Sequence, residues 1–255
     1  MARALVLQAA GINCDLETAR AFELAGASAD LRHVNTLDVR DPFAGYDLLA
    51  IPGGFSYGDD VAAGRILGDR IVRQFGDALH RFVDSGRPVL GICNGFQVLV
   101  SAGLLPGGNA ERAALDTNVS GSFACRWVTL RRGGASSIWT ADFAADEAIE
   151  LPIAHAEGRL IGDEATIDRH AAFTYAEPAQ RLSDDLPANP NGSVADVAGL
   201  TDSTGLVMGL MPHPERYVEP MQHPAYAKKH IEKSGDNGEP AGLRLFRSAV
   251  RATSA

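Results

Sequence analysis

The sequence predicts an α/β fold: a mostly parallel, open β-sheet with helices on both faces, and an antiparallel extension in the second half. Two observations support this prediction. Up to about residue 102, short apolar runs alternate with segments of helical periodicity, as in βαβ units. Beyond about residue 120, strand-like runs follow one another without long helices, which indicates antiparallel pairing or a mixed sheet. Because no linker-like segment divides the chain, we expect residues 1–255 to form a single domain.

The first half contains the expected parallel strands and their helices. The segment 69–85 shows apolar residues at helical spacing, and Gly86 ends it. The neighbouring short apolar runs are typical of buried strands. We expect strands at 3–8, 29–34, 46–51 and 88–92, and helices at 15–25, 69–85 and 94 to about 102.

The second half has a different texture. Two segments rich in Gly, Pro, Asn and Asp, 184–193 and 233–242, are typical of loops, and a closing helix follows from about Leu243. Further strands are expected at 123–131, 151–156, 171–176, 193–200 and 206–210.

Composition narrows the possible functions. The formal net charge is −9, whereas duplex-binding proteins usually show a basic face, so we expect no nucleic-acid partner. The most apolar window, 89–105, is interrupted by polar residues and three glycines, so we expect no membrane span. The three cysteines, Cys14, Cys93 and Cys125, form no C-x-x-C pair, which argues against a disulfide framework or a cysteine zinc site. A reducing, cytoplasmic location is therefore expected.

Cys93 lies in Gly91-Ile92-Cys93-Asn94-Gly95, between a predicted strand and a predicted helix. In G-x-S-x-G enzymes a nucleophile occupies such a strained turn, and glycines provide the steric room. The positive end of a helix and a nearby histidine favour the reactive thiolate. The five residues are equally compatible with a small buried cysteine of the core. A partner base has to decide between the two interpretations.

His213 is the candidate base. It follows the apolar run 206–210 at the expected carboxyl edge of the sheet, where the turn at Cys93 also lies. Prolines on both sides restrict its backbone, and Glu215 is close enough in sequence to orient the imidazole, as carboxylates do in catalytic triads. The alternative is a surface turn with a chance histidine. No metal site is expected, because His155, His213 and His223 lack the spacing of helical zinc ligands.

Gly53 and Gly54 end another predicted strand. Two successive glycines allow backbone N–H groups to approach a substrate, and with the N–H of Asn94 they would form an oxyanion hole. An ordinary turn explains two glycines equally well. A phosphate-binding loop does not fit, because no Gly-Lys-Ser/Thr follows.

These motifs, taken together and in this order, resemble those of class I, triad-type glutamine amidotransferases. They are 51–59 (IPGGFSYGD), 91–97 (GICNGFQ) and 211–216 (MPHPER). Other segments resemble, more narrowly, the glutaminase subunits of phosphoribosylformylglycinamidine synthase, and the resemblance covers nearly the whole chain. They are 13–15 (NCD), 153–155 (IAH), 157–158 (EG), 173–175 (FTY) and 191–194 (NGSV). The first loop, 8–12 (QAAGI), and the long segment 217–240 depart from the pattern and put partner contacts in doubt.

The resemblance implies a class I amidotransferase fold and hydrolysis of L-glutamine by Cys93, His213 and Glu215. It implies that the substrate is held by four further residues, which are Gln97, Asn191, Gly192 and Ser193. It also implies a large synthetase subunit that receives the ammonia and uses ATP and Mg²⁺ to make formylglycinamidine ribonucleotide, together with a small accessory subunit. No cofactor is expected in this chain, because no ATP loop is visible.

Three alternatives are weighed against this interpretation. A glutaminase subunit of another amidotransferase is disfavoured by the Asn-Gly pair after Cys93 and by the segment 191–193. A cysteine enzyme of the serine-hydrolase type would have the acid before the histidine, whereas His213 precedes Glu215. A non-catalytic scaffold that only binds a synthetase would be expected to have lost one of these reactive residues.

Overall fold

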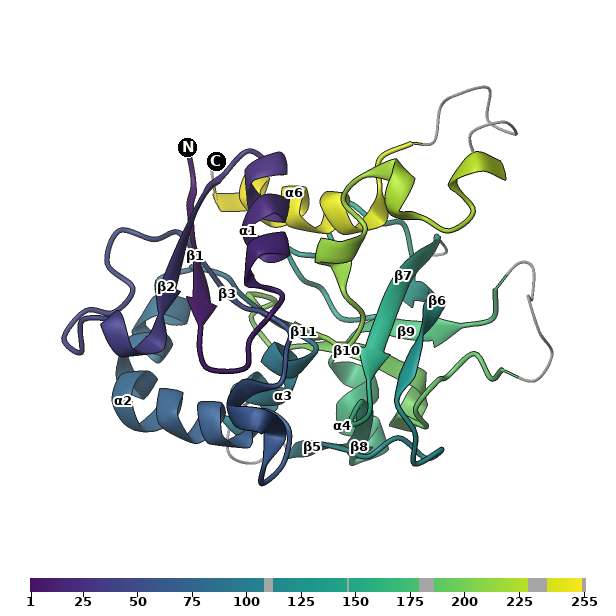
Figure 1. Ribbon diagram of the computed structural model, residues 1–255, viewed down its shortest axis with the longest axis horizontal. Helices are drawn as coiled ribbons and strands as arrows, with labels where there is room; N and C mark the ends of the chain where they lie inside the picture. The colour runs from purple at the N-terminus through teal and green to yellow at the C-terminus, as the bar shows by residue number, and fades with distance from the viewer. Residues whose placement is uncertain (108–111, 146, 179–185, 229–237, 254–255) are drawn as a thin grey trace.

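The structure is a computed structural model and describes residues 1–107, 112–145, 147–178, 186–228 and 238–253. Within these ranges, nine strands form one mixed sheet in the order β2-β1-β3-β4-β11-β10-β9-β6-β7, and β5 pairs with β8 separately (Figure 1). In the described part of the chain, no helix has the length and apolar character needed to cross a bilayer.

Five neighbouring strands form the parallel half of the sheet. They are β2 (Ser28–His33), β1 (Arg3–Gln8), β3 (Leu48–Ile51), β4 (Val89–Ile92) and β11 (Val207–Leu210). The last three strands in this order are buried along their whole length. This matches their continuous apolar sequence, because strands covered on both faces have no solvent side.

Helices cover both faces of this parallel half (Figure 1). The connection from β1 to β2 through α1 (Asp15–Leu24) runs in the opposite direction along the sheet from the one through α2 (Arg65–Asp84). Right-handed crossovers therefore place these helices on opposite faces. The C-terminal α6 (Ala241–Thr253) joins α1, where Phe22 and Phe246 meet edge to face at 4.9 Å. The short α3 (Asn94–Ser101) joins α2.

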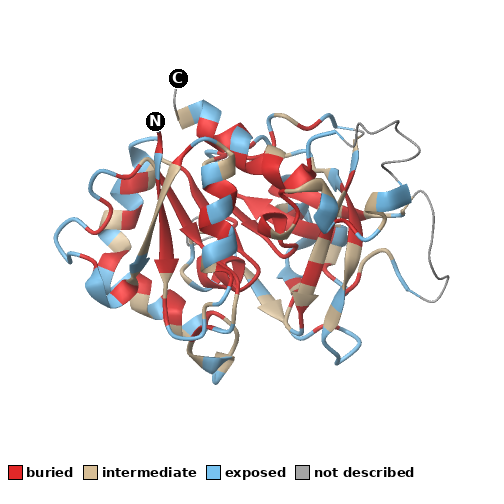
Figure 2. Cartoon of the chain, turned by 45° about the horizontal axis from the view of Figure 1, so that its top comes forward, coloured by how far each residue is buried: buried red, intermediate tan, exposed pale blue. Residues whose placement is uncertain are grey.

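The second half extends the sheet with antiparallel pairs. Its strands are β10 (Val197–Thr201), β9 (Ala171–Ala176), β6 (Ala124–Arg132) and β7 (Ala148–His155). The smaller elements nearby are β5 (Ala113–Asp116), β8 (Arg159–Gly162) and α4 (Glu164–Arg169). Buried side chains concentrate on the strands and on the inner faces of the helices (Figure 2).

The predicted fold class is confirmed, with local differences. Helix α2 begins at Arg65 rather than at residue 69, and the start of the predicted strand 193–200 is a 3-10 turn, Val194–Asp196. The short elements β5, β8 and α4 were not predicted, because pieces of four to six residues show too little periodicity. Parts of the two predicted loops, 184–185 and 233–237, lie outside the described residues.

Candidate active site

Cys93 occupies a sharp turn between β4 and α3. Its backbone has φ 49° and ψ −104°, a strained conformation for a residue with a side chain. Its N–H still donates to Leu210 O at 2.8 Å, so the turn begins directly at the sheet edge. Glycine is required at position 95, because a Cβ there would lie 1.8 Å from Ile51 O. These features match the strained strand-to-helix turn predicted from the sequence.

The thiol of Cys93 is covered by the last strand of the sheet. Sγ–H donates to Ala154 O of β7 at 3.7 Å, and Cys93 is only 5% exposed. The same strand edge accepts the His213 N–H at Pro152 O, 2.8 Å away. The outer edge of β7 therefore fixes both the thiol and the base. A nucleophile at such a turn is expected to be accessible, whereas the structure shows the Cys93 thiol closed off.

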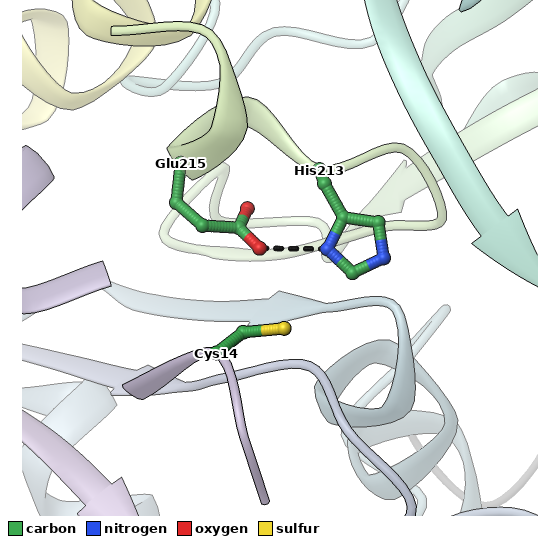
Figure 3. A group of neighbouring side chains, drawn as sticks. All are labelled: Cys14, His213 and Glu215. Carbon is green, nitrogen blue, oxygen red and sulfur yellow. Dashed lines mark hydrogen bonds and ion pairs between the residues drawn. The ribbon is translucent and has the colours of Figure 1, made fainter. Parts of the chain in front are cut away.

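His213 and Glu215 form a buried pair (Figure 3). His213 Nδ1 and Glu215 Oε1 are 2.6 Å apart, and the two residues are 2% and 1% exposed. Burial lowers the pKa of His213, but the charge of Glu215 and the thiols of Cys93 and Cys14 outweigh this and raise it well above its ordinary value. With Nδ1 bound to Glu215, the ring has Nε2 available, which has no protein partner among the described residues.

Cys14 is a second thiol beside the base, and the sequence analysis missed it. It caps the N-terminus of α1, and its sulfur points toward the His213 ring (Figure 3). Arg216 donates to Cys14 Sγ at 3.0 Å, and atoms of Cys14, His213 and Glu215 lie within 4.8 Å of one another. This donor set could hold a cation, but the Arg216 guanidinium at the sulfur opposes one. The N-C-D motif at 13–15 was the available signal.

The loop with the two glycines after β3 packs against the His213 ring. A Cβ on Gly53 would come within 2.8 Å of His213 Cε1, and a Cβ on Gly54, whose φ is 149°, within 2.6 Å of Gly11 O. The loop continues to Ser56, whose N–H donates to Asn94 Oδ1 at 3.2 Å. The N–H of Asn94 itself is at the first position of α3, where helix N–H groups lack an intrahelical acceptor.

Gln97 lies one turn into α3 and belongs to a buried amide chain. Asn94 Nδ2 donates to Gln97 Oε1 at 2.9 Å, and Gln97 Nε2 donates to Glu157 O at 2.5 Å. Asn94 Nδ2 also donates to Asp59 Oδ1 at 3.1 Å. Burial raises the pKa of Asp59, against hydrogen bonds from Gly64 and Asn94 that lower it. The chain links the turn at Cys93 to the segment after β7.

Asn191, Gly192 and Ser193 lie against that same segment. Asn191 Nδ2 donates to Gly158 O at 2.7 Å, and Ser193 Oγ donates to Asn191 Oδ1 at 2.7 Å. Gly192 has φ 80° and faces Val119. Because the two polar side chains already bond within the protein, they brace residues 157–160 and offer little to a ligand without rearranging.

His155 ends β7 and is buried, 3% exposed. Its Nδ1 lies 3.1 Å from Asn118 Oδ1, while its Nε2 has no partner among the described residues. Burial first, and then the charge of His213, lower the pKa of His155 to about 4. The ring is therefore neutral at physiological pH.

A cavity of about 610 Å³ opens between α2, α3 and β5. Gln97 contributes to its lining, but Cys93 and His213 do not. The structure thus brings Cys93, His213 and Glu215 together with the glycine loop and the Gln97 chain, in a closed arrangement. Residues 191–193 adjoin this group through Gly158.

Comparison with known proteins identifies the family of the chain. A family model described as a CobB/CobQ-like glutamine amidotransferase domain matches residues 1–251. The chain therefore belongs to the glutamine amidotransferases, and it is an enzyme of this class.

The more similar relatives narrow this assignment. Phosphoribosylformylglycinamidine synthase subunit PurQ from Dehalococcoides mccartyi is 39% identical, over 98% of this chain and 96% of that protein. The PurQ subunit from Treponema denticola is 42% identical, over 85% of this chain and 88% of that protein. The structure of PurLQS from Thermotoga maritima matches with a TM-score of 0.76 and 30% identity, over 98% of both chains. The resemblance to this group of subunits, predicted from the motifs, is confirmed.

Proposed function

We propose that this chain hydrolyses L-glutamine and supplies the ammonia to a synthetase that makes phosphoribosylformylglycinamidine. The observation that supports it best is the 2.6 Å His213–Glu215 pair beside the strained turn of Cys93. A buried cysteine of the core would need neither a positive φ nor a base held by a carboxylate.

The residues divide the chemistry as follows. The Cys93 thiol gives its proton to His213, which Glu215 keeps in the correct orientation, and the resulting thiolate attacks the carboxamide carbon. The oxygen that becomes negative is held by backbone N–H groups of Gly54 and Asn94. His213 then protonates the leaving nitrogen, ammonia departs, and a thioester remains on Cys93. Water, deprotonated by His213, attacks the thioester and releases glutamate.

The substrate's position is defined by the polar residues around the turn. Gln97 accepts a hydrogen bond from Asn94, and Gly53 of the proposed oxyanion loop lies next to the His213 ring. The residues at 191–193 brace residues 157–160 and hold the other end of glutamine through the backbone, so Asn191, Gly192 and Ser193 act mainly as positioning residues.

A partner follows from the fate of ammonia. In bulk water at neutral pH, ammonia becomes ammonium and loses its nucleophilic lone pair. A glutaminase that donates nitrogen should therefore dock on its acceptor. The similarity to PurLQS supports a synthetase subunit as partner. We propose that this subunit is large and that a small accessory subunit completes the complex. We propose that ATP and Mg²⁺ bind to the synthetase, that this chain needs no cofactor, and that the complex is cytoplasmic.

The test is the Cys93→Ala variant in the assembled enzyme. We expect it to lose glutamine-dependent amidation, by at least about 10⁴-fold, because the covalent path is removed. Amidation with added ammonium salts should stay at the wild-type rate. Equal loss of both activities would contradict a pure nitrogen-donor role.

The same assay separates the alternatives. Retention of glutamine-dependent activity by Cys93→Ala would favour a non-catalytic scaffold that only binds the synthetase. Glutamine hydrolysis without any amidation of formylglycinamide ribonucleotide would indicate a glutaminase that serves another amidotransferase.

A further inference from the structure

The orientation of the His155 ring is determined by Asn118. Asn118 Nδ2 donates to two carbonyl oxygens, Ser122 O and His155 O, both at 2.9 Å. Its Oδ1 therefore faces the ring, and it also accepts the Gly158 N–H at 3.1 Å. A pure acceptor 3.1 Å from His155 Nδ1 requires the proton to be on Nδ1. Nε2 is consequently an unprotonated acceptor.

This acceptor is buried and has no donor among the described residues. Buried polar atoms almost always have a partner, and an exception calls for a ligand or water that supplies one. No other end of the ring can serve, because Nδ1 is already bound and a Cβ on Gly158 would overlap the ring at 2.3 Å from Nδ1. The ring is therefore held in place, and its Nε2 has no hydrogen-bond partner among the described residues.

His155 lies next in sequence to a residue that contacts the candidate nucleophile. His155 directly follows Ala154, whose carbonyl oxygen contacts Cys93 Sγ at 3.7 Å. Two residues further back on the same strand, Pro152 O accepts the His213 N–H. The charge of His213 is close enough to lower the pKa of the His155 ring. The strand segment that carries His155 therefore borders the place where a substrate would bind at Cys93.

The two imidazoles are tuned in opposite directions. The pKa of His213 is raised, so this ring can carry a proton, whereas the pKa of His155 is lowered to about 4, so this ring stays a neutral acceptor. Groups in one site whose pKa values are pushed apart have different tasks. His155 can therefore accept a hydrogen bond from an N–H group and does not compete with His213 for a proton.

We propose that His155 Nε2 accepts a hydrogen bond from the carboxamide NH₂ of bound glutamine and orients the leaving nitrogen toward His213. This role rests on the proposed function. It also gives a basis for specificity, because glutamate, the product, has no N–H at this position to offer Nε2.

The test compares two reactions of Cys93 that differ in this N–H. One is glutamine hydrolysis. The other is alkylation by the chloromethyl ketone analogue of glutamine, in which CH₂Cl replaces NH₂. There the sulfur forms a C–S bond and chloride leaves as the C–Cl bond breaks, so no amide N–H is involved. Both are measured on the chain assembled with its synthetase.

For His155→Phe we expect kcat/KM for glutamine to fall about ten-fold or more, the usual effect of losing one buried hydrogen bond. The alkylation rate of Cys93 should change less than about two-fold. His155→Gln, which places an amide oxygen near the position of Nε2, should recover much of the loss. His170→Phe replaces a buried histidine bonded to Thr201 O, outside the site, and should alter neither reaction.

Each outcome is decisive. A parallel loss of hydrolysis and alkylation in His155→Phe would show a structural role only and overturn the proposal. Unchanged hydrolysis would overturn it as well. If His155→Phe does not fold, the His155→Gln variant decides. The proposal requires that this variant hydrolyse glutamine within about ten-fold of the wild-type rate. A wild-type chain that hydrolyses no glutamine would instead refute the proposed function.

Discussion

At the scale of single residues, His155 and His213 are two buried imidazoles next to the edge of β7 with different pKa values. His213 has Glu215 at 2.6 Å and two thiols beside it, whereas the Nδ1 of His155 faces the neutral amide of Asn118. Both rings are buried, so the difference comes from their partners and not from exposure. This difference can be measured through stability.

Acidification should destabilise the protein through His155. Its folded pKa of about 4 lies below the unfolded value of 6.5, so the unfolded chain binds the extra proton first. The contribution of His155 is therefore present above pH 6.5 and is lost as pH falls from 6.5 toward 4. Between pH 7 and pH 5 this removes roughly 2 kcal/mol from the free energy of unfolding.

Urea unfolding of wild type and His155→Phe at both pH values checks this prediction. The loss between pH 7 and pH 5 should be smaller in the variant by that amount. An identical loss in both proteins would show that His155 does not titrate as described.

At the scale of elements, the placement of α3 depends on two glycines. Gly91 is in β4, where a Cβ would lie 2.5 Å from Gly95 O, and Gly95 is in α3, where a Cβ would lie 1.8 Å from Ile51 O. The absence of side chains lets the helix begin directly on the strands. The helix N-terminus and its N–H groups thereby stay at the sheet edge, beside the thiol.

Gly95→Ala should lower the free energy of unfolding by about 1–3 kcal/mol, because α3 must move away from β3. Gly76→Ala is the matched control. Gly76 is inside α2, where a Cβ would meet only Val72 Cγ1 at 3.9 Å, so the same change should stabilise by about 0.5–1 kcal/mol. Chemical denaturation measures both, and equal effects would contradict the role of close packing at Gly95.

At the scale of the whole molecule, the site is closed in the isolated chain. Cys93 and His213 are 5% and 2% exposed, and the cavity beside Gln97 does not reach them. The covering strand β7 and the loop after β3 come from opposite halves of the chain. Entry of glutamine therefore requires a change in their relative position, and a docked partner can favour such a change.

We expect the isolated chain to be a weak glutaminase. Adding the synthetase should raise kcat by at least about ten-fold, because docking stabilises the open or productive arrangement. Steady-state glutamate production with and without the synthetase measures this. Full activity of the chain alone would contradict the dependence on docking.

The parts of the fold and site that could be predicted depend on short, local stretches of the sequence. The parallel strands are continuous apolar runs, and the turn at Cys93 needs the glycines that flank it. Glu215 can reach His213 because it is only two positions further along the chain. The start of α2 and the short elements β5, β8 and α4 were not predictable, because their sequences are weakly periodic and packing determines their conformation.

The sequence by itself determined the α/β class and singled out Cys93, His213 and Glu215 as candidates, because strand runs, glycine turns and i, i+2 spacing are local properties of the chain. Only the tertiary structure decided which groups surround that set. The contact between Cys14 and Arg216 spans 202 positions, and the one between Cys93 and Ala154 spans 61. The first contact follows from the placement of β11 in the parallel half of the sheet, and the second from the return of β7 to the edge of that half. No local pattern records either of them. The closed thiol results from that return, and so does the burial of His155, whose Nε2 has no partner in the described part of the chain.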